Sequence, residues 1–443
     1  MRRCERRHAR YRRGCSQALI PDEAASVPRL RGKGRRIAAC PDLFIPSRIF
    51  TVPPSAWSSQ SFNFALFFFG YFGFVGVFAP YASLYFAEKG MTAAQIGILM
   101  SLMQVMRIFG PNLWGWVADH SRQRVSVLRY TALAAVVSFC GLFFGQTFAY
   151  YFVVMVVLNL FVSAQAPLSD AMVLSSLKGD LTHYGKLRLW GSVGFIVAVA
   201  GAGPAMDWQG IELMPWISLC MLGLTLFASW GVKEPAHSGI AHQAPSAIGM
   251  LKRREVAAFF LSTFMMIASH AALYVFYSLY LEQIGYSKTL IGLMWAVGVI
   301  CEIAFFFYQA PIFRRFGIRN LMLASLILAF IRFLLIGFGA ESVILLLLAQ
   351  VLHAATFGVH HSASIATLQR WFAGPLQARG QALFISISYG MGGTVGGLVL
   401  SACWERFGAQ AVYVGAALFA LGGAVAAAYS YHWQLQDKEG KRQ

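Results

Sequence analysis

Long apolar runs separated by short polar stretches fill the chain from about residue 61 to residue 431. Runs such as YFVVMVVLNLFV and VILLLLAQVL are continuously apolar and lack the alternation typical of strands in a membrane β-barrel. Because many runs reach the roughly 20 residues that span a bilayer as a helix, we predict an all-α polytopic membrane protein. Its twelve predicted transmembrane helices cover residues 61–86, 95–118, 126–146, 149–176, 186–206, 212–231, 256–282, 290–312, 319–338, 342–368, 379–402 and 410–431.

The longest polar connector divides these spans six and six, at residues 233–255. We therefore predict a six-helix half over residues 58–232, a cytoplasmic linker, and a second six-helix half over residues 256–433. An N-terminal extension over 1–57 and a cytoplasmic tail over 434–443 flank them. The composition agrees, because charged residues make up only 12% of the chain, against about 25% in a soluble domain.

The two halves repeat each other in the same orientation. With a shift of 195 positions, SLYFAEKGMTAAQIGILM (83–100) aligns without a gap with SLYLEQIGYSKTLIGLMW (278–295). The same shift pairs Arg107 with Glu302 and Arg124 with Arg319. Two such repeats are the plan of a secondary transporter whose site lies between the halves, near the middle of the membrane.

Basic residues gather on one side of the predicted membrane. Fifteen Lys and Arg residues lie in turns on the side of the two termini, against three (Lys89, Lys288 and Arg406) on the other side. The positive-inside rule therefore places both termini in the cytoplasm, and we predict a multi-pass protein of the inner membrane.

The extension over residues 1–57 supplies half of the net charge of +18, with thirteen Lys and Arg against four acidic residues. It lacks hydrophobic periodicity, which indicates disorder. One interpretation is a basic arm attracted to anionic lipid. The interpretation that we favour is a dispensable extension or a misassigned start. Because the charge is concentrated there, we do not expect a nucleic-acid partner.

The turn between the second and third predicted helices reads GWVADHSRQR, residues 115–124. It resembles the signature loop of the major facilitator superfamily, G-x-x-x-D-R/K-x-G-R/K-R/K, at Gly115, Asp119 and Arg124, and departs from it at His120, Arg122 and Gln123. We predict that the three matching residues form a conformational latch, in which Asp119 accepts hydrogen bonds from a helix N-terminus or from an arginine. The alternative is a solvated turn that only sets the topology.

Ionisable residues are rare inside the predicted spans. A charged group at mid-bilayer costs at least ~2.5 kcal/mol, so those that remain usually face a cavity. Asn159, Ser163 and Asp170 share one stripe of a helix, and Arg188 follows on the next, antiparallel helix, where it can meet Asp170. Desolvated carboxylates bind and release protons near neutral pH, which makes Asp170 and Glu302 candidates for proton coupling.

From about residue 64 to residue 431 the chain resembles the phenylpropionate permease branch of the superfamily, in the passages YGKLRLWGSVGF, PLSDA, GYSKTLIGLMWAVGVICEI and LHAATFGVHH. The branch is related to lactose permease. This resemblance implies a substrate-binding acid and arginine at Asp170 and Arg188, and a proton-coupling arginine and histidine at Arg332 and His353.

Two positions depart from lactose permease. Phe195 stands where the sugar-stacking tryptophan is expected, which argues against a galactoside. Thr356 stands where the coupling glutamate is expected, so the proton is expected elsewhere, and Glu302 is our choice.

We therefore predict a proton-coupled importer of a small organic solute, most consistent with an aromatic carboxylate such as 3-phenylpropionate. Glu302, with His353 or His270, is predicted to carry the proton. The predicted substrate-binding residues are Asp170, Arg188, Trp190, Phe195, Tyr274, Trp295 and Arg332.

Other functions remain open on the same frame. They are a nucleoside or sugar symporter, a drug exporter, and a non-transporting receptor or scaffold. The sequence has no G-x-x-x-x-G-K-S/T motif and no C-x-x-C pair, so we expect no ATP-driven step, no metal, no cofactor and no enzymatic activity. The expected partners are a small-molecule substrate, protons and the lipid bilayer, and the expected state is a monomer driven by the proton gradient.

Overall fold

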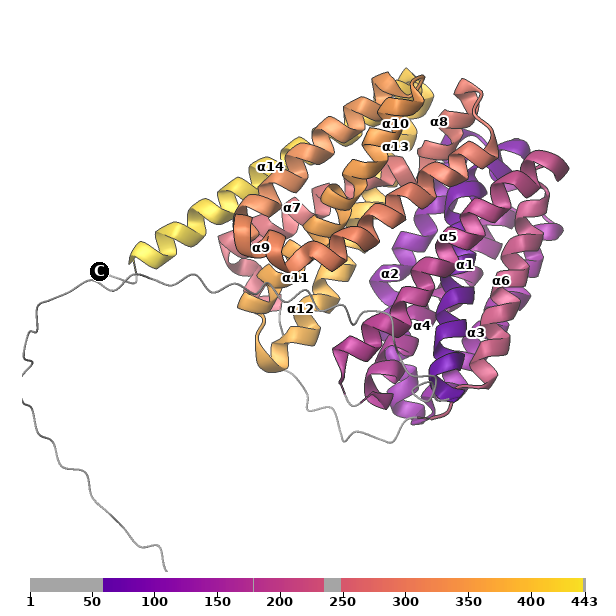
Figure 1. Ribbon diagram of the computed structural model, residues 1–443, viewed down its shortest axis with the longest axis horizontal. Helices are drawn as coiled ribbons and strands as arrows, with labels where there is room; N and C mark the ends of the chain where they lie inside the picture. The colour runs from indigo at the N-terminus through magenta and orange to yellow at the C-terminus, as the bar shows by residue number, and fades with distance from the viewer. Residues whose placement is uncertain (1–58, 178, 235–247, 441–443) are drawn as a thin grey trace, which may run out of the picture. The chain divides into compact units, whose positions relative to one another are not determined.

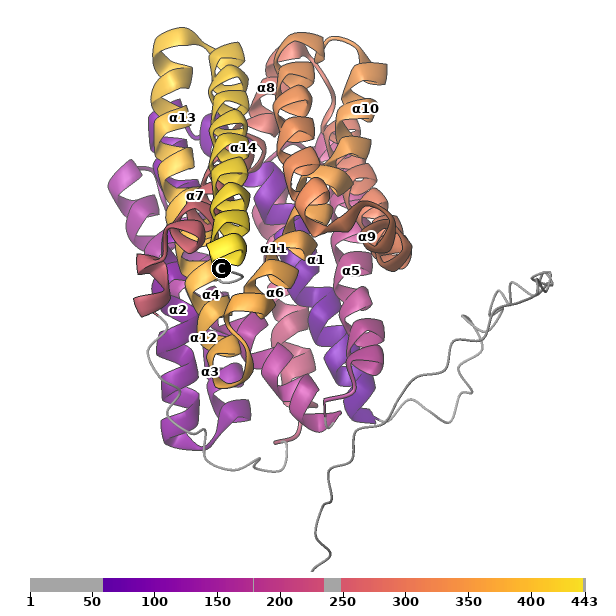
Figure 2. The same cartoon turned by 90° about the vertical axis from the view of Figure 1, so that its left-hand side faces the viewer.

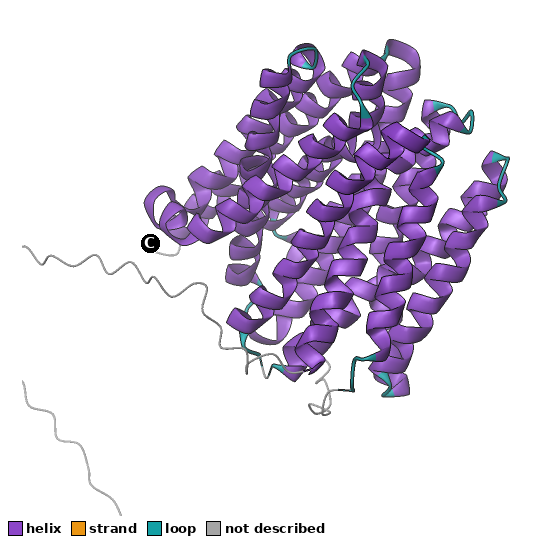
Figure 3. Ribbon diagram, turned by 45° about the vertical axis from the view of Figure 1, so that its right-hand side comes forward, coloured by secondary structure: helices purple, strands orange, loops and turns teal. Residues whose placement is uncertain are grey.

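The structure, a computed structural model, describes residues 59–177, 179–234 and 248–440. The predicted extension over 1–57 lies outside the described residues, as do residues 235–247 of the linker and 441–443 of the tail. In the described ranges every regular element is a helix (Figure 3). Eleven of these helices are long and apolar enough to cross a membrane. The chain is an integral, multi-pass membrane protein.

Six long helices form the N-terminal half (Figure 1). They are α1 (Ser59–Glu88), α2 (Ala93–Ser121), α3 (Arg124–Cys140), α4 (Phe148–Ser176), α5 (Leu181–Gln209) and α6 (Leu213–Trp230), and the short η2 (Gly141–Phe143) extends α3. Glycines allow α1 and α5 to pack closely, since a Cβ on Gly194 would lie 2.2 Å from the Phe69 carbonyl oxygen.

The C-terminal half is built from more, shorter elements. They are η3 (Ile248–Lys252), α7 (Arg254–Ala271), η4 (Ala272–Phe276), α8 (Tyr277–Ile284), α9 (Lys288–Gly339), α10 (Val343–His353), η5 (Ala354–Val359), α11 (His360–Trp371), η6 (Gly374–Leu376), α12 (Gln377–Phe384), η7 (Ile385–Gly392), α13 (Gly393–Phe407) and α14 (Ala409–Gly440). Helix α14 packs against α7, α9 and α13 (Figure 2). It continues through residues 434–440, which we had predicted as a tail.

Helix α9 accounts for the difference between eleven helices and twelve predicted spans. Its 52 residues would make a straight helix of roughly 78 Å, more than twice the hydrocarbon thickness of a bilayer. Gly317 interrupts it with φ 73° and ψ 157°, a conformation that glycine adopts without a Cβ clash. The chain reverses there, so α9 contributes two crossings, and the predicted twelve-helix fold is confirmed.

Three spans of the C-terminal half contain π-helical segments. These segments are η4 between α7 and α8, η5 between α10 and α11, and η7 between α12 and α13. A π-turn widens the helix and shifts the side chains that follow it, and such turns are frequent at functional sites. Tyr274, Thr356 and Tyr389 all lie in these segments.

The two halves are tied mainly at one end of the bundle, which we call the α1–α2 end because it holds the turn between these helices. The opposite end, where α6 leads into the linker, is called the linker end. The main contacts between halves join α1, α2 and α5 to α8, α9, η4, η7 and α13. A Cβ on Gly203 of α5 would lie 2.7 Å from the Lys288 carbonyl oxygen, so α5 and α9 approach closely at this end.

Candidate functional site

Asp170 and Arg188 lie on neighbouring helices, α4 and α5, but form no ion pair in the described part of the chain. Instead, the Tyr184 hydroxyl donates a hydrogen bond to Asp170 Oδ1 at 3.1 Å, and Arg188 lies beside the same phenol. Tyr184 therefore connects the two predicted residues. It precedes Arg188 by one helical turn, and it was not among the predicted site residues.

The Arg188 guanidinium stacks on an aromatic ring rather than on a carboxylate. Its Cζ lies 3.7 Å from the centroid of the Phe72 ring, a cation–π contact. Gly191 leaves room for this arrangement, because a Cβ there would lie 2.7 Å from Arg188 Nη1. The side chain is half-buried, and stacking leaves the in-plane edge of the guanidinium available for a bidentate anion.

A second cation of the N-terminal half, Arg107 in α2, reaches the C-terminal half. Its Cζ lies 5.8 Å from the centroid of the Tyr389 ring in η7. Tyr71 of α1 is within electrostatic range of Arg107, Arg188 and Asp170. The three ionisable groups therefore lie around one region. Arg107 was not among the predicted site residues; the 195-residue shift that pairs it with Glu302 was the sequence signal that could have indicated it.

Glu302 of α9 is the acidic group that the C-terminal half brings to this region. Its Cγ lies 3.4 Å from the position of a Cβ on Gly358, in η5. It is half-buried and within electrostatic range of Arg188 and of Tyr274 and Tyr389. Its carboxylate has no hydrogen bond or ion pair to any described residue.

Arg332 is fully buried in the C-terminal half, and its donors are used there. Nε donates to the Ala349 carbonyl oxygen at 2.7 Å, Nη1 to Thr356 Oγ1 at 3.2 Å, and Nη2 to Gln350 Oε1 at 3.5 Å. Gln350 in turn donates to the Tyr277 hydroxyl at 2.7 Å. In the described residues no carboxylate lies within 4 Å of Arg332, so the guanidinium is held by neutral groups.

His270 and His353 lie beside this network. His270 Nδ1 is 2.9 Å from the Met266 carbonyl oxygen, which makes Nδ1 the donor, and Nε2 is 3.5 Å from Thr356 Oγ1. The His270 ring centroid is 6.2 Å from that of His353, and the His353 ring stacks on Phe357 at 5.4 Å. His353 Nδ1 is buried without a partner in the described residues. The structure brings both predicted histidines together with Arg332.

The predicted aromatic residues occupy different environments. Trp295 is buried, its indole N–H donates to Ser278 Oγ at 3.2 Å, and its ring stacks on Tyr274 at 6.3 Å. Phe195 packs against Gly76 of α1, and Trp190 is 41% exposed. Trp295 and Tyr274 are therefore the pair that the structure brings together.

A small cavity lies between the halves beside Tyr274. Its volume is about 10 Å³, and Ser101, Gln104 and Tyr274 are among its lining residues. Ser101 Oγ and Gln104 Oε1 are buried without a partner in the described residues. A space of this size holds about one water molecule.

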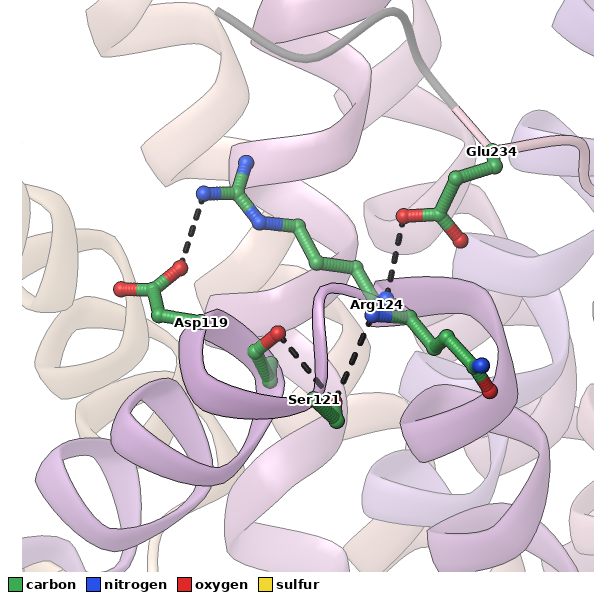
Figure 4. Close-up of polar contacts among 6 residues, drawn as sticks. Asp119, Ser121, Arg124 and Glu234 are labelled. Atoms are coloured by element: carbon green, nitrogen blue, oxygen red, sulfur yellow. Dashed lines mark hydrogen bonds and ion pairs between the residues drawn. The ribbon is translucent and has the colours of Figure 1, made fainter. Parts of the chain in front are cut away.

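The predicted latch residues lie on the two helices beside the short connection between α2 and α3: Asp119 is in the last turn of α2 and Arg124 is the first residue of α3 (Figure 4). Arg124 Nη2 is 2.9 Å from Asp119 Oδ1. Glu234, which was not predicted, accepts from the backbone N–H groups of Arg124 and Val125 at 3.0 and 2.9 Å and so caps α3. Gly115 has no neighbour within 4 Å of a Cβ position. Among the described residues these contacts join α2, α3 and the start of the linker, and none of them reaches the C-terminal half.

Comparison with known proteins gives the same fold. Residues 61–415 match the MFS_1 like family. A protein from Escherichia coli (strain K12) named "Probable 3-phenylpropionic acid transporter" is 30% identical over 340 residues, which cover 75% of this chain and 87% of that protein. Maltose permease from Geobacillus stearothermophilus is 27% identical over 358 residues, 79% and 89% of the two chains. The crystal structure of the nucleoside transporter NupG superposes with a TM-score of 0.74 at 18% identity, over 84% of this chain and 99% of that one.

Proposed function

Because the chain belongs to the MFS_1 like family of membrane transporters, we propose that it is a proton-coupled symporter that imports an aromatic carboxylate of the 3-phenylpropionate kind. The relative with 30% identity carries that substrate in its name. The proposal rests on one observation. Arg188 and Glu302 lie in opposite halves, within electrostatic range of each other, and neither has an ion-pair partner among the described residues.

In the proposed cycle, Arg188 binds the substrate carboxylate. Its in-plane N–H groups suit a bidentate carboxylate, and its stack on Phe72 holds the guanidinium plane in place. Tyr184 and Asp170 position Arg188 from the side. The apolar ring of the substrate lies against Tyr274 and Trp295, where aromatic contacts favour an aromatic substrate over an aliphatic one.

Glu302 carries the proton. An ionised Glu302 attracts Arg188 across the halves, whereas a protonated Glu302 leaves Arg188 to the substrate anion. Protonation and substrate binding therefore favour each other, which is the linkage that symport requires. Arg332 already places one uncompensated positive charge beside His270 and His353, so a proton on either ring would meet like-charge repulsion. This is why Glu302 is preferred to the histidines.

Arg332 takes a structural role in this proposal. Its three donor nitrogens are bound within the C-terminal half, so a substrate anion would have to displace Ala349, Thr356 or Gln350. The proposed orientation keeps both termini in the cytoplasm, with the protein in the inner membrane. The proposed energy source is the proton gradient, without a cofactor, and the proposed state is a monomer.

A nucleoside is the second candidate substrate. A nucleoside transporter is among the structures with the same fold, and the Tyr184–Asp170 pair offers a neutral donor and an acceptor that suit ribose hydroxyl groups. The two candidates differ in charge. Only the carboxylate requires Arg188 to keep its positive charge for binding.

The test is uptake of radiolabelled 3-phenylpropionate and of a labelled nucleoside by cells that express the full chain. We expect 3-phenylpropionate to accumulate and a protonophore to abolish the accumulation. Glu302→Gln should lose accumulation by at least about tenfold while it keeps exchange of labelled for unlabelled substrate. Glu341→Gln, an exposed glutamate at the turn before α10, is the matched control and should transport normally. Uptake of the nucleoside alone would overturn the proposed substrate. Normal accumulation by Glu302→Gln would overturn the proposed proton site.

A further inference from the structure

At the α1–α2 end, two carboxylates accept hydrogen bonds from the opposite half. Asp207, near the end of α5, accepts hydrogen bonds from the backbone N–H groups of Lys288 and Thr289 at 2.8 and 2.9 Å and from Thr289 Oγ1 at 2.6 Å. Glu405, near the end of α13, accepts from the backbone N–H of Ala94 at 2.8 Å. Each carboxylate thus lies at the N-terminus of a long helix in the opposite half.

Helices α2 and α9 do not use these backbone N–H groups in their own N-terminal caps, so the groups can bond to the other half. At α2, the Thr92 side chain accepts from the Gln95 backbone N–H, and at α9 the Ser287 side chain accepts from the Leu290 N–H. These local caps use the third helical N–H and leave the first two without an intrahelical partner. Asp207 and Glu405 take N–H groups from this pair, where the positive end of the helix dipole also favours a carboxylate.

The two contacts are equivalent by the internal repeat. Thr289 lies 195 positions after Ala94, and Glu405 lies 198 positions after Asp207. In each half, therefore, the second membrane-spanning helix is capped by the fifth helix of the other half. The second helices are α2 and the first part of α9, and the fifth helices are α5 and α13. Two independent surface contacts would not be expected to obey the symmetry of the repeat.

The same helix pairs pack closely just below the caps. A Cβ on Gly203 would lie 2.8 Å from Thr289 Cα, and one on Gly97 would lie 2.7 Å from Ser401 Cβ. Tyr81 adds a third link at this end, since its hydroxyl lies 3.1 Å from the Val199 carbonyl oxygen and 3.0 Å from that of Lys288. Separation of the halves at the α1–α2 end must therefore break both caps.

We propose that Asp207 and Glu405 are a symmetric pair of cross-capping carboxylates that set the equilibrium between the closed and open states of the α1–α2 end. In the closed state, each capped helix N-terminus is satisfied by the opposite half. In the open state, water replaces the carboxylates. The inference does not depend on the substrate or on the proton site.

Two other acids at this end provide matched controls because their ion pairs stay within one half. Glu212 pairs with Lys89 at 2.7 Å in the N-terminal half, and Glu282 pairs with Lys288 at 3.2 Å in the C-terminal half. Removal of Glu212 and Glu282 changes the charge of the same surface but breaks neither of the carboxylate caps that join the halves.

The experiment measures distances between spin labels by double electron–electron resonance on the full chain with its native cysteines replaced. One label pair reports the α1–α2 end, at the exposed positions Gln146 and Glu341, and the other reports the linker end, at Gln123 and Gln377. We expect Asp207→Ala/Glu405→Ala to populate a longer distance at the first pair and a shorter one at the second. Each single variant should shift the equilibrium on the order of fivefold, the effect of losing one helix cap.

The outcomes separate a conformational role from a folding defect. Loss of the fold would broaden both distance distributions, whereas opening lengthens one and shortens the other. Asp207→Asn, which keeps one acceptor oxygen but loses the charge, should fall between wild type and Asp207→Ala. The proposal is overturned if the double variant keeps the wild-type distances, or if Glu212→Ala/Glu282→Ala produces the same shift.

Discussion

The N-terminal and C-terminal halves repeat one sequence pattern, yet Arg188 and Arg332 differ in exposure and in hydrogen-bond partners. In the N-terminal half, Arg188 is half-buried, stacks on Phe72 and has no carboxylate partner in the described chain. In the C-terminal half, Arg332 is fully buried and donates to three neutral groups. The first arrangement leaves hydrogen-bonding capacity for a ligand, and the second uses it to hold helices together.

The positions related by the 195-residue shift show the same divergence. Arg107 in α2 corresponds to Glu302 in α9, so equivalent backbone positions carry opposite charges that face one region. The π-helical segments occur only in the C-terminal half among the described residues. A repeat thus supplies the symmetric frame, and the halves differ by local changes of charge and helix geometry; in the proposed function, the N-terminal half binds the anion and the C-terminal half binds the proton.

The largest effect is expected at Arg188. Arg188→Ala removes the proposed bidentate contact of two charge-assisted hydrogen bonds, each worth roughly 1.5–3 kcal/mol, so the KM for the carboxylate substrate should rise by at least about 100-fold. Arg188→Lys should recover part of the affinity, because it keeps the charge but loses the planar fork. Thermal unfolding should stay near the wild type in both variants. An unchanged KM in Arg188→Ala would remove the anion site from the N-terminal half.

Arg332 should show the reverse pattern. Arg332→Ala leaves a cavity and frees three buried acceptors, so we expect a loss of about 2–4 kcal/mol in stability. The measurement is thermal unfolding in detergent alongside Arg188→Ala, which serves as the matched control. If Arg332→Ala unfolds like the wild type and only the KM changes, Arg332 contacts the substrate, and both halves then use an arginine for binding.

The helical periodicity and run lengths were sufficient to predict the twelve crossings, including the two that α9 joins through Gly317. The three π-helical segments could not be predicted, because they differ from α-helix by one extra residue per turn, which leaves no mark in an apolar run. The charge pattern predicted Asp170, Arg188 and Glu302 as ionisable groups in the membrane. Their partners depend on side-chain direction, and for this reason Tyr184 and the stack on Phe72 were missed.

The cross-half carboxylates show the same limit. Asp207 and Glu405 lie just beyond the predicted spans 186–206 and 379–402, where an acidic residue is usually solvated, and nothing in their spacing indicates a bond to the other half. We did not predict the caps of α2 and α9, although Thr92 and Ser287 are hydroxyl residues of the kind that favour N-cap positions. Contacts between the halves can be identified only from the three-dimensional arrangement of the helices.

A smaller effect is expected at Tyr184, which connects Asp170 to Arg188, the residue that we propose to bind the substrate anion. Tyr184→Phe removes the hydrogen bond to Asp170 at 3.1 Å but keeps the ring, so the KM should rise about fivefold, in line with one hydrogen bond of about 1 kcal/mol. Tyr150→Phe, an exposed tyrosine at the start of α4, is the control. A KM equal to the wild type would mean that Asp170 does not position Arg188 through Tyr184.

The smallest effect is expected in the turn before α5, which the C-terminal half does not share: Asp180 caps α5, whereas the residue 195 positions later is Pro375. A hydrogen bond from His183, at 2.6 Å, with help from backbone N–H groups, holds the pKa of the Asp180 carboxyl below its ordinary value. A lowered pKa in the folded state contributes stability that is complete above the unfolded value of about 4 and is lost as the pH falls through the folded value. The wild type should therefore lose stability more steeply than Asp180→Asn, which keeps the cap but does not titrate, when thermal unfolding is followed from pH 7 to pH 3. Glu88→Gln, an exposed acid with the same change of charge, should leave the wild-type profile intact, and equal slopes for wild type and Asp180→Asn would show that the Asp180–His183 contact adds nothing to the fold.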